Sequence, residues 1–226
     1  MKKIFLIVSA SFLIAACNEN KPSHQASNNQ TNKDSTQELD LTQFGMSENS
    51  NPKGLSIGDS APVITMKSSE SEDISLESLY RDQPLVVIFY RGYWCPVCNR
   101  HLSEFAERAV EIENAGAKIV AITPESYENT EKTVDNTRID FTVISDVDGS
   151  VMRAFGVQFD VTDDYHSMIE EKFNVSISET NENKQATLPV PATFIIDTNG
   201  TIVYKQFNPD YKQRASVDDI LENLPK

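Results

Sequence analysis

Short apolar runs alternate with amphipathic stretches of helix length from about residue 54 to the end of the chain. Runs rich in β-branched residues predict buried strands, and apolar positions spaced three and four apart predict helices packed on one face. The predicted strands span residues 63–66, 85–90, 118–123, 141–145, 193–196 and 201–204. The predicted helices span residues 75–80, 96–115, 126–137, 150–155 and 163–173, with a last helix after Ser216. This alternation predicts an α/β fold with a central mixed sheet, parallel in its middle and flanked by helices.

The last two predicted strands are separated by Asp197-Thr198-Asn199-Gly200. Asn-Gly is a strong hairpin signal, so we expect these strands to pair antiparallel. Residues 158–188, just before the hairpin, form an insertion too long for an ordinary connection, and such loops often cover sites. The helix predicted within it has one apolar side, formed by Tyr165, Met168, Ile169 and Phe173.

The start of the chain has the pattern of an export signal. Met1-Lys2-Lys3 is followed by an apolar run shorter than the roughly 18 residues that a membrane-spanning helix needs. The run ends at Ile14-Ala15-Ala16-Cys17, which resembles the lipobox of bacterial lipoproteins. The resemblance implies a lipoprotein signal peptide at residues 1–16 and a lipid on Cys17. An ordinary cleaved signal followed by a chance cysteine is the alternative.

A lipid on Cys17 implies a protein anchored in the bacterial cell envelope and facing the periplasm. Asn18 stands where an aspartate would be expected for inner-membrane retention, so the analogy favours the outer membrane. Residues 17–53 are rich in Asn, Ser, Gln and Thr, and we expect a disordered tether spanning on the order of 30 Å before a folded domain at residues 54–226. A short apolar patch within the tether is expected to dock locally: Leu39, Leu41, Phe44 and Met46.

The formal net charge of −14 bears on the class of partner. Nucleic acid carries the same sign of charge, so binding to it is disfavoured. The same charge gives no electrostatic hold on anionic lipid, which leaves the lipid on Cys17 as the expected contact with the membrane.

Cys95 and Cys98 follow the predicted strand 85–90 and start the helix predicted from Pro96. With Cys95 as the helix N-cap, Pro96 occupies the first helical position, where a missing N–H has no cost. The spacing of three places both sulfurs on one helix face, at a separation compatible with a disulfide. An exported compartment permits such a bond to persist.

Three kinds of chemistry fit this pair: a redox-active dithiol, a static disulfide, or half of a zinc site. No second cysteine pair exists to complete a zinc site, and His101, otherwise expected to be exposed on the helix surface, supplies only a third ligand. A C-x-x-C motif before a helix in an α/β pattern favours redox chemistry. We expect the helix terminus and Arg91 or Arg100 to lower the pKa of the Cys95 thiol.

Four stretches carry a resemblance to a known family. They are Phe-Tyr-Arg-Gly-Tyr-Trp-Cys-Pro-Val-Cys at residues 89–98, Ser-Asp-Val-Asp-Gly at 145–149, Val-Pro-Ala-Thr-Phe-Ile-Ile-Asp at 190–197 and Asn-Pro-Asp-Tyr-Lys-Gln-Arg at 208–214. The chain resembles the thioredoxin-fold peroxiredoxins of the alkyl hydroperoxide reductase and thiol-specific antioxidant (AhpC/TSA) family, in particular a peroxiredoxin-like branch with a similar insertion. The resemblance covers about residues 54–224 and implies a thioredoxin-like fold and no cofactor.

The resemblance implies a role for each thiol. Cys95, followed by Pro96, matches the peroxidatic cysteine, which attacks a peroxide oxygen and becomes a sulfenic acid. Cys98 would resolve that sulfenic acid to a disulfide, which a thioredoxin-like donor reduces by exchange. These roles imply an antioxidant enzyme that reduces hydroperoxides.

Two positions depart from the family pattern. Gly92 stands where the pattern has a threonine three residues before the peroxidatic cysteine, and Pro191 stands where an arginine is common. Those residues orient peroxide and stabilise developing charge, so their roles here need replacements. The candidates are Arg91, Arg153 and Arg214.

Two other functions stay open, the first of them because of Pro191. A thioredoxin-like disulfide reductase has a proline at the position of Pro191, facing its C-x-x-C motif, and would use Cys95 and Cys98 on protein disulfides. Trp94 and Tyr93, next to the thiols, are placed to contact a partner protein, although packing into the core is at least as strong an alternative. A non-catalytic metal carrier would combine the two thiols with His101.

Overall fold

The computed structural model describes residues 39–67 and 73–226. The expected signal peptide, Cys17 and the first part of the expected tether lie outside the described residues. The compact unit begins at Leu39, earlier than the boundary expected near Gly54. Within the two described ranges, no helix has the length and apolar character needed to cross a membrane.

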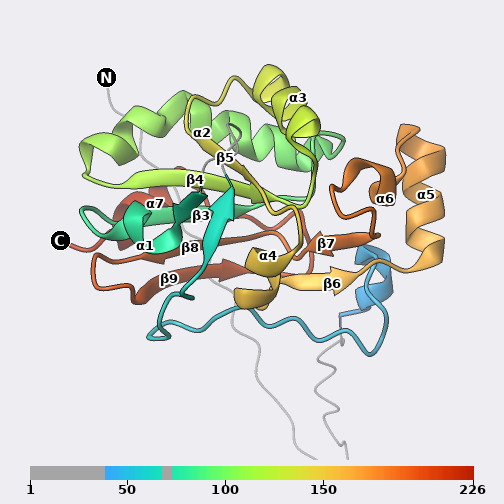
Figure 1. The fold of residues 1–226 in the computed structure, drawn as a ribbon, viewed down its shortest axis with the longest axis horizontal. Coiled ribbons are helices and arrows are strands. Elements are labelled where there is room, and N and C mark those ends of the chain that lie inside the picture. Colours follow the sequence, from blue (N-terminus) through green and yellow to red (C-terminus); the bar gives the residue numbers. More distant parts are fainter. Residues whose placement is uncertain (1–38, 68–72) are drawn as a thin grey trace, which may run out of the picture. The chain divides into compact units, whose positions relative to one another are not determined.

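A seven-stranded mixed sheet has the order β2-β1-β5-β4-β3-β8-β9 (Figure 1). Strands β3, β4 and β5 are parallel neighbours, and β8 pairs antiparallel with both β3 and β9. The strands are β1 (Thr65–Lys67), β2 (Asp73–Ser75), β3 (Leu85–Phe89), β4 (Lys118–Thr123), β5 (Thr142–Ser145), β8 (Ala192–Ile196) and β9 (Ile202–Phe207). The parallel centre and the late antiparallel hairpin are therefore as predicted.

Helices cover both faces of this sheet. Successive side chains of β3 point to opposite faces, so each face of the strand packs in a separate apolar layer. Val86 and Ile88 pack in the layer that includes α2 and α7, whereas Val87 and Phe89 pack with α1 and α4. The helices are η1 (Leu41–Phe44), α1 (Leu76–Tyr80), α2 (Pro96–Asn114), α3 (Tyr127–Thr137), α4 (Ser150–Ala154), α5 (Asp163–Phe173), α6 (Ile177–Thr180) and α7 (Val217–Asn223). Each predicted helix is present, with ends within one residue of the prediction.

The strand predictions are less complete. The first strand, expected at residues 63–66, is β1 at Thr65–Lys67. Strand β2 precedes α1 and was not predicted, and neither were the two short strands that border the insertion, β6 (Gln158–Asp160) and β7 (Thr187–Pro189). Strands of three residues carry too little periodicity to be recognised in a sequence.

The insertion is a folded unit rather than an open loop. Strands β6 and β7 pair antiparallel at its base, and α5 and α6 follow one another between them. Tyr165 and Ile169 of α5 are buried as expected, but Met168 is 39% exposed, so its assignment to the apolar side was wrong. Met46 bridges Val161 beside this unit, which attaches the segment after η1 to the insertion.

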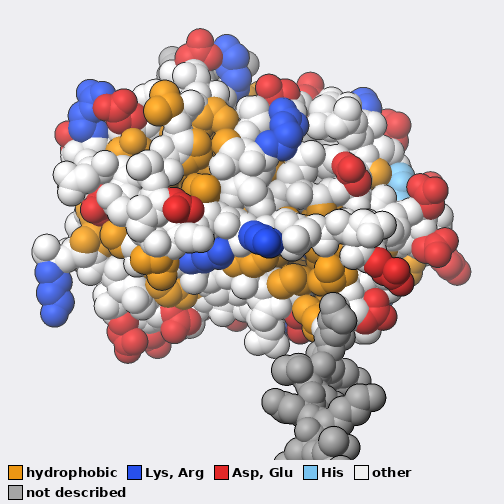
Figure 2. Space-filling view, turned by 90° about the horizontal axis from the view of Figure 1, so that it is seen from below, with side chains coloured by type: hydrophobic (Ala, Val, Ile, Leu, Met, Phe, Trp, Pro, Cys, Tyr) orange, Lys and Arg blue, Asp and Glu red, His pale blue; other side chains and the backbone are white. Residues whose placement is uncertain are grey.

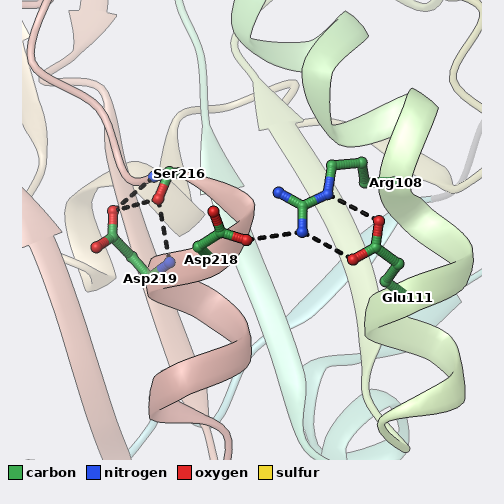
Figure 3. A network of polar contacts seen from close by, with 5 residues as sticks. All are labelled: Arg108, Glu111, Ser216, Asp218 and Asp219. Atoms are coloured by element: carbon green, nitrogen blue, oxygen red, sulfur yellow. Dashed lines mark hydrogen bonds and ion pairs between the residues drawn. The ribbon is translucent and has the colours of Figure 1, made fainter.

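Polar contacts link α7 to α2 at the surface and cap the start of α7 (Figure 3). Arg108 of α2 donates to Glu111 and to Asp218, each at 2.7 Å from Nη2. Ser216 and Asp219 form a reciprocal capping box at the start of α7, which confirms the cap expected there with aspartate in place of glutamate. This cap fixes the start of α7 two residues after Ala215, whose carbonyl lies 2.9 Å from Nε2 of His101 on α2.

The surface charge is distributed in groups. Figure 2 shows acidic side chains gathered toward parts of the rim of one face, with lysine and arginine side chains scattered among apolar and neutral ones. A face of this kind offers no continuous basic area for a polyanion, in keeping with the formal net charge of −14.

Candidate active site

Cys95 and Cys98 lie where the chain leaves the central strand and starts a helix. Cys95 is the N-cap of α2, with Pro96 in the first turn, and its sulfur accepts a hydrogen bond from the Cys98 N–H at 3.3 Å. The two sulfurs form a disulfide with the Cα atoms 5.2 Å apart. Both cysteines are 0% exposed, so the oxidised pair is sealed from solvent although Pro96 beside it is exposed. The cap geometry expected for the pair is thus present.

Arg91 provides a cation at the Cys95 sulfur. Its Nη2 donates to Cys95 Sγ at 3.3 Å, and its Nη1 donates to the Tyr165 hydroxyl at 2.6 Å. The guanidinium lies 3.6 Å from the centre of the Tyr211 ring and 5.3 Å from that of Trp94. Arg91 is 3% exposed and takes part in none of the ion pairs found among the described residues. A thiolate at Cys95 would supply the missing anion.

A second arginine reaches the other sulfur. Arg214, in the segment between β9 and α7, places Nη2 at 3.5 Å from Cys98 Sγ, and its Nε donates to the Tyr211 carbonyl at 2.6 Å. Burial and the like charge of Arg91 lower the pKa of Arg214 to about 9, against the opposing effect of Asp210. Of the three arginines considered as replacements, Arg91 and Arg214 contact the thiols. Arg153 instead donates to the carbonyl of Asp148.

Gly92 is required by close approach. A Cβ atom at this position would collide with Glu125 Oε1 and Trp94 Nε1, and the residue has φ of +155°. Glu125, in turn, accepts a hydrogen bond from the Tyr93 N–H at 2.9 Å. Burial raises the pKa of the Glu125 carboxyl well above its ordinary value, and the Tyr93 N–H and Lys132 only partly oppose this. Through this hydrogen bond, the buried Glu125 carboxyl supports the loop that leads to Cys95.

Trp94 and Pro191 are both buried. Trp94 is 6% exposed and packs on Phe173 of the insertion, with ring centres 6.3 Å apart, so its packing role holds and it presents no open face to a partner. Pro191 is buried between β7 and β8, directly before the strand that pairs with β3. The late strand is therefore entered through a proline, as the sequence indicated.

His101 is not exposed on the helix surface, and that expectation was wrong. The ring is 4% exposed, lies edge-on against Phe105, and places Nε2 at 2.9 Å from the Ala215 carbonyl. Burial, and secondarily the charge of Arg214, lower the pKa of His101 to about 4. Among the described residues, no group of three or more His, Cys, Asp or Glu side chains is arranged to hold a metal ion. His101 is thus a neutral packing residue that joins α2 to the start of α7.

Tyr165, Tyr211 and Glu125 were not predicted as site residues. Tyr165 lies on the inserted helix α5. The only indication in the sequence that it belongs to the site was the expectation that the insertion covers a site. Glu125 lies two residues after the end of β4, and β4 is the parallel neighbour of β3, so the sheet brings it to the same edge as Arg91. That signal was available in the sequence. Tyr211 lies in the stretch 208–214 that carries the family resemblance, but that stretch assigned it no role.

Comparison with known proteins identifies the fold and the family. The model of the family described as AhpC/TSA matches residues 57–205. Among curated proteins, the chain is similar to the chloroplastic peroxiredoxin Q of Sedum lineare, with 26% identity over 167 residues, covering 74% of this chain and 76% of that protein. It is also similar to a putative peroxiredoxin of Mycobacterium tuberculosis (strain H37Rv), with 25% identity over 154 residues, covering 68% of this chain and 86% of that protein.

Solved structures share the fold at low identity. Peroxidoxin BcpB from Mycobacterium tuberculosis matches with a TM-score of 0.56 and 22% identity, covering 74% of this chain and 94% of that chain. Reduced Prx3 from Vibrio vulnificus, in complex with H2O2, matches with a TM-score of 0.60 and 15% identity, covering 74% of this chain and 97% of that chain. These matches confirm the predicted thioredoxin-like fold class.

Proposed function

Because the chain belongs to the AhpC/TSA family, we propose that Cys95 is its peroxidatic thiol and that Cys98 is the thiol that closes the disulfide. The protein is a thiol-dependent peroxidase of the peroxiredoxin type, an oxidoreductase that acts on hydroperoxides. The observation that carries the assignment of Cys95 is the Arg91 guanidinium, which donates to its sulfur at 3.3 Å inside a buried site. A cation so placed favours the thiolate, and the thiolate is the nucleophile.

The first step is an attack by the Cys95 thiolate on a peroxide oxygen. The new S–O bond forms as the O–O bond breaks, and the departing oxygen takes a proton and leaves as water or an alcohol. The sulfur is oxidised to sulfenic acid while the peroxide is reduced. The N–H groups of the Arg91 guanidinium lie beside the Cys95 sulfur. During the attack the sulfur loses negative charge and the leaving oxygen gains it, so Arg91 can stabilise the charge on both atoms.

The second step joins the two sulfurs. Cys98, one helical turn from Cys95, attacks the sulfenic sulfur, the S–O bond breaks and water leaves. The described geometry corresponds to the product of this step, because the sulfurs are bonded and the cap of α2 is intact. Peroxiredoxins are reduced by thioredoxin-like partners, and such a donor would return both sulfurs to thiols by exchange.

The similarity to peroxiredoxins favours peroxide over a protein disulfide as the oxidising substrate, and the small size of peroxide suits the buried sulfurs. Both cysteines are 0% exposed, and the ring of Trp94, in the loop before them, packs on Phe173 of the insertion. A molecule the size of hydrogen peroxide needs a smaller opening than a strand of a folded protein, which must present its own disulfide to Cys95. A thioredoxin-like donor must also reach the buried disulfide, so it is the similarity to peroxiredoxins, and not burial alone, that gives the disulfide-reductase alternative less support.

The peroxidase assignment is tested by stopped-flow oxidation of the reduced protein with hydrogen peroxide, followed by the fluorescence of Trp94. We expect a second-order rate well above that of free cysteine, loss of the reaction in Cys95→Ser, and a stable sulfenic acid in Cys98→Ser. Cys17→Ser is the matched control, because it removes the remaining cysteine and should leave the rate unchanged. Oxidation of the wild-type protein no faster than free cysteine would refute the assignment.

We also propose that Cys17 bears a lipid that anchors the protein in the bacterial cell envelope, facing the periplasm and favouring the outer membrane. The support is the Ile14-Ala15-Ala16-Cys17 sequence at the end of a short apolar run. Labelling cells with a fatty-acid analogue should tag the wild-type protein and not Cys17→Ser, which should fractionate as a soluble protein. Labelling of Cys17→Ser at the wild-type level would contradict the anchor.

A further inference from the structure

Each sulfur of the disulfide has its own arginine. Arg91, directly before the active-site loop, contacts Cys95. Arg214, more than a hundred residues later in the chain, contacts Cys98. The two arginines are brought together by Tyr211, whose ring stacks under Arg91 and whose carbonyl accepts from Arg214 Nε. One cation per sulfur is more than activation of the attacking thiol requires.

We propose that Arg214 is a catalytic residue of the disulfide-forming step, in which its guanidinium stabilises the Cys98 thiolate that attacks the Cys95 sulfenic acid. This inference rests on the proposed roles of the two thiols. The reaction is balanced: Cys98 loses a proton, its sulfur bonds to the Cys95 sulfur, and the departing hydroxide takes up a proton and leaves as water. No further oxidant or reductant is needed.

The need for a cation at Cys98 follows from the chemistry of thiols. An ordinary thiol, with a pKa of about 8.5, is only a few per cent thiolate at neutral pH, and the thiol itself is a poor nucleophile. The N-terminus of α2 is already used on the other sulfur, since the Cys98 N–H points at Cys95 Sγ. Cys98 therefore needs a separate source of positive charge.

His101 does not provide that charge. It lies one turn beyond Cys98 on α2, but its ring is buried against Phe105 with Nε2 at the Ala215 carbonyl. The lowered pKa of His101, about 4, keeps it neutral at neutral pH. Arg91 is already directed at Cys95 and Tyr165. Arg214 is thus the cation whose donor is aimed at Cys98.

The surroundings of Arg214 hold the guanidinium in place and leave it short of an anion. Its Nε is fixed by the Tyr211 carbonyl, and it forms none of the ion pairs recorded in residues 39–67 and 73–226. Other titratable groups line the same surface pocket as Arg214 or belong to its own loop: Arg100, Glu104, Asp210, Tyr211 and Lys212. A thiolate at Cys98 is the anion that the arrangement accommodates.

The first test does not depend on peroxidase activity. In Cys95→Ser, Cys98 is the thiol left in the site, and its ionisation is followed by thiolate absorbance or by the pH dependence of alkylation. We expect alkylation at neutral pH to be about tenfold slower when Arg214→Met is added, and to recover in part with Arg214→Lys. Arg100→Gln removes an exposed cation from α2, the helix that carries Cys98. It is the matched control and should have little effect on the alkylation rate. Equal alkylation rates with and without Arg214 would overturn the proposal.

The second test separates the two steps of the reaction. In Arg214→Met, sulfenic acid formation with hydrogen peroxide should stay within about twofold of wild type, while disulfide closure slows about tenfold at neutral pH and recovers as the pH rises past the thiol pKa. Equal slowing of both steps would mean that Arg214 only holds the structure, and would refute the proposal. Absence of sulfenic acid in the wild-type protein would refute the peroxidase assignment instead, and the alkylation test would still decide the role of Arg214.

Discussion

Arg91 and Tyr165 are joined by a 2.6 Å hydrogen bond across 74 positions of sequence, and the same guanidinium contacts the Cys95 sulfur. Tyr165 belongs to the insertion, and its ring packs against Gly45, where an added Cβ would lie 2.7 Å away. The inserted helix thus reaches the arginine that serves the attacking thiol, and Gly45, at the end of η1, packs on the tyrosine that makes this contact. The insertion is part of the active site rather than an appendage.

Tyr165→Phe should slow peroxide oxidation of Cys95 about threefold to tenfold at neutral pH. The phenyl ring keeps the packing on Gly45 but removes the acceptor that aligns Arg91, so the thiolate loses part of its charge-assisted hydrogen bond. The pH profile of Cys95 alkylation in Cys98→Ser should shift to higher pH. Tyr80→Phe, in α1, is the control for loss of a tyrosine hydroxyl elsewhere, and a shift of the same size there would contradict the positioning role.

Gly92→Thr should destabilise the protein by roughly 1–3 kcal/mol, although threonine is the residue that the family pattern has there. The new side chain collides with Glu125 and Trp94, and its backbone conformation is one that favours glycine. Thermal unfolding should show the lower stability, and peroxide oxidation should slow rather than accelerate. A stable Gly92→Thr variant with faster oxidation would show that the loop accepts the family arrangement.

Glu125→Gln should become progressively more stabilising, relative to wild type, as the pH rises. The folded pKa of Glu125 is raised by burial, so the folded protein holds a proton that the unfolded chain releases near pH 4.5. Wild-type stability therefore falls by up to about 1.4 kcal/mol per pH unit between the unfolded and folded pKa values, whereas glutamine keeps the acceptor for the Tyr93 N–H and has no such dependence. Melting temperatures of both proteins from pH 4 to about 8 measure the effect.

Asp146 also has a raised pKa, but it does not affect the comparison between wild type and Glu125→Gln. Burial raises its pKa to about 6, with the Met152 and Val151 N–H groups opposing, so it too makes stability fall with rising pH. Both proteins carry Asp146, and its contribution cancels in the difference. A difference in melting temperature that stays constant with pH would show that Glu125 is ionised in the folded protein.

Ser216→Ala should lower the free energy of unfolding by about 1 kcal/mol, because it removes the side chain that caps α7. The loss should be insensitive to salt. Asp218→Asn, which breaks the exposed contact with Arg108, is the control and should cause little change in stability at ordinary ionic strength. Chemical denaturation of the three proteins at low and high salt measures both effects. A larger effect for Asp218→Asn would mean that the ion pair, and not the cap, fixes α7.

The local sequence determined the start of the active-site helix. A buried β-branched strand, a glycine and the Cys-Pro pair specify a strand-to-helix turn through short-range preferences, so the N-cap at Cys95 and the extent of α2 were predictable. The same holds for the Asn-Gly hairpin and for α5, whose apolar spacing is a property of the helix itself. Errors arose where periodicity is short, as in β1 and β2, or where burial depends on distant partners, as at His101 and Met168.

What surrounds the sulfurs was decided by the tertiary structure alone. Spacing places Cys98 near Cys95, but nothing local states that Arg91 meets Tyr165, or that Arg214 meets Cys98. Those contacts depend on how the insertion and the segment before α7 fold back over α2, which results from the packing of many apolar side chains together. The sequence therefore determined where the two thiols stand, and the fold determined which cations stand beside them.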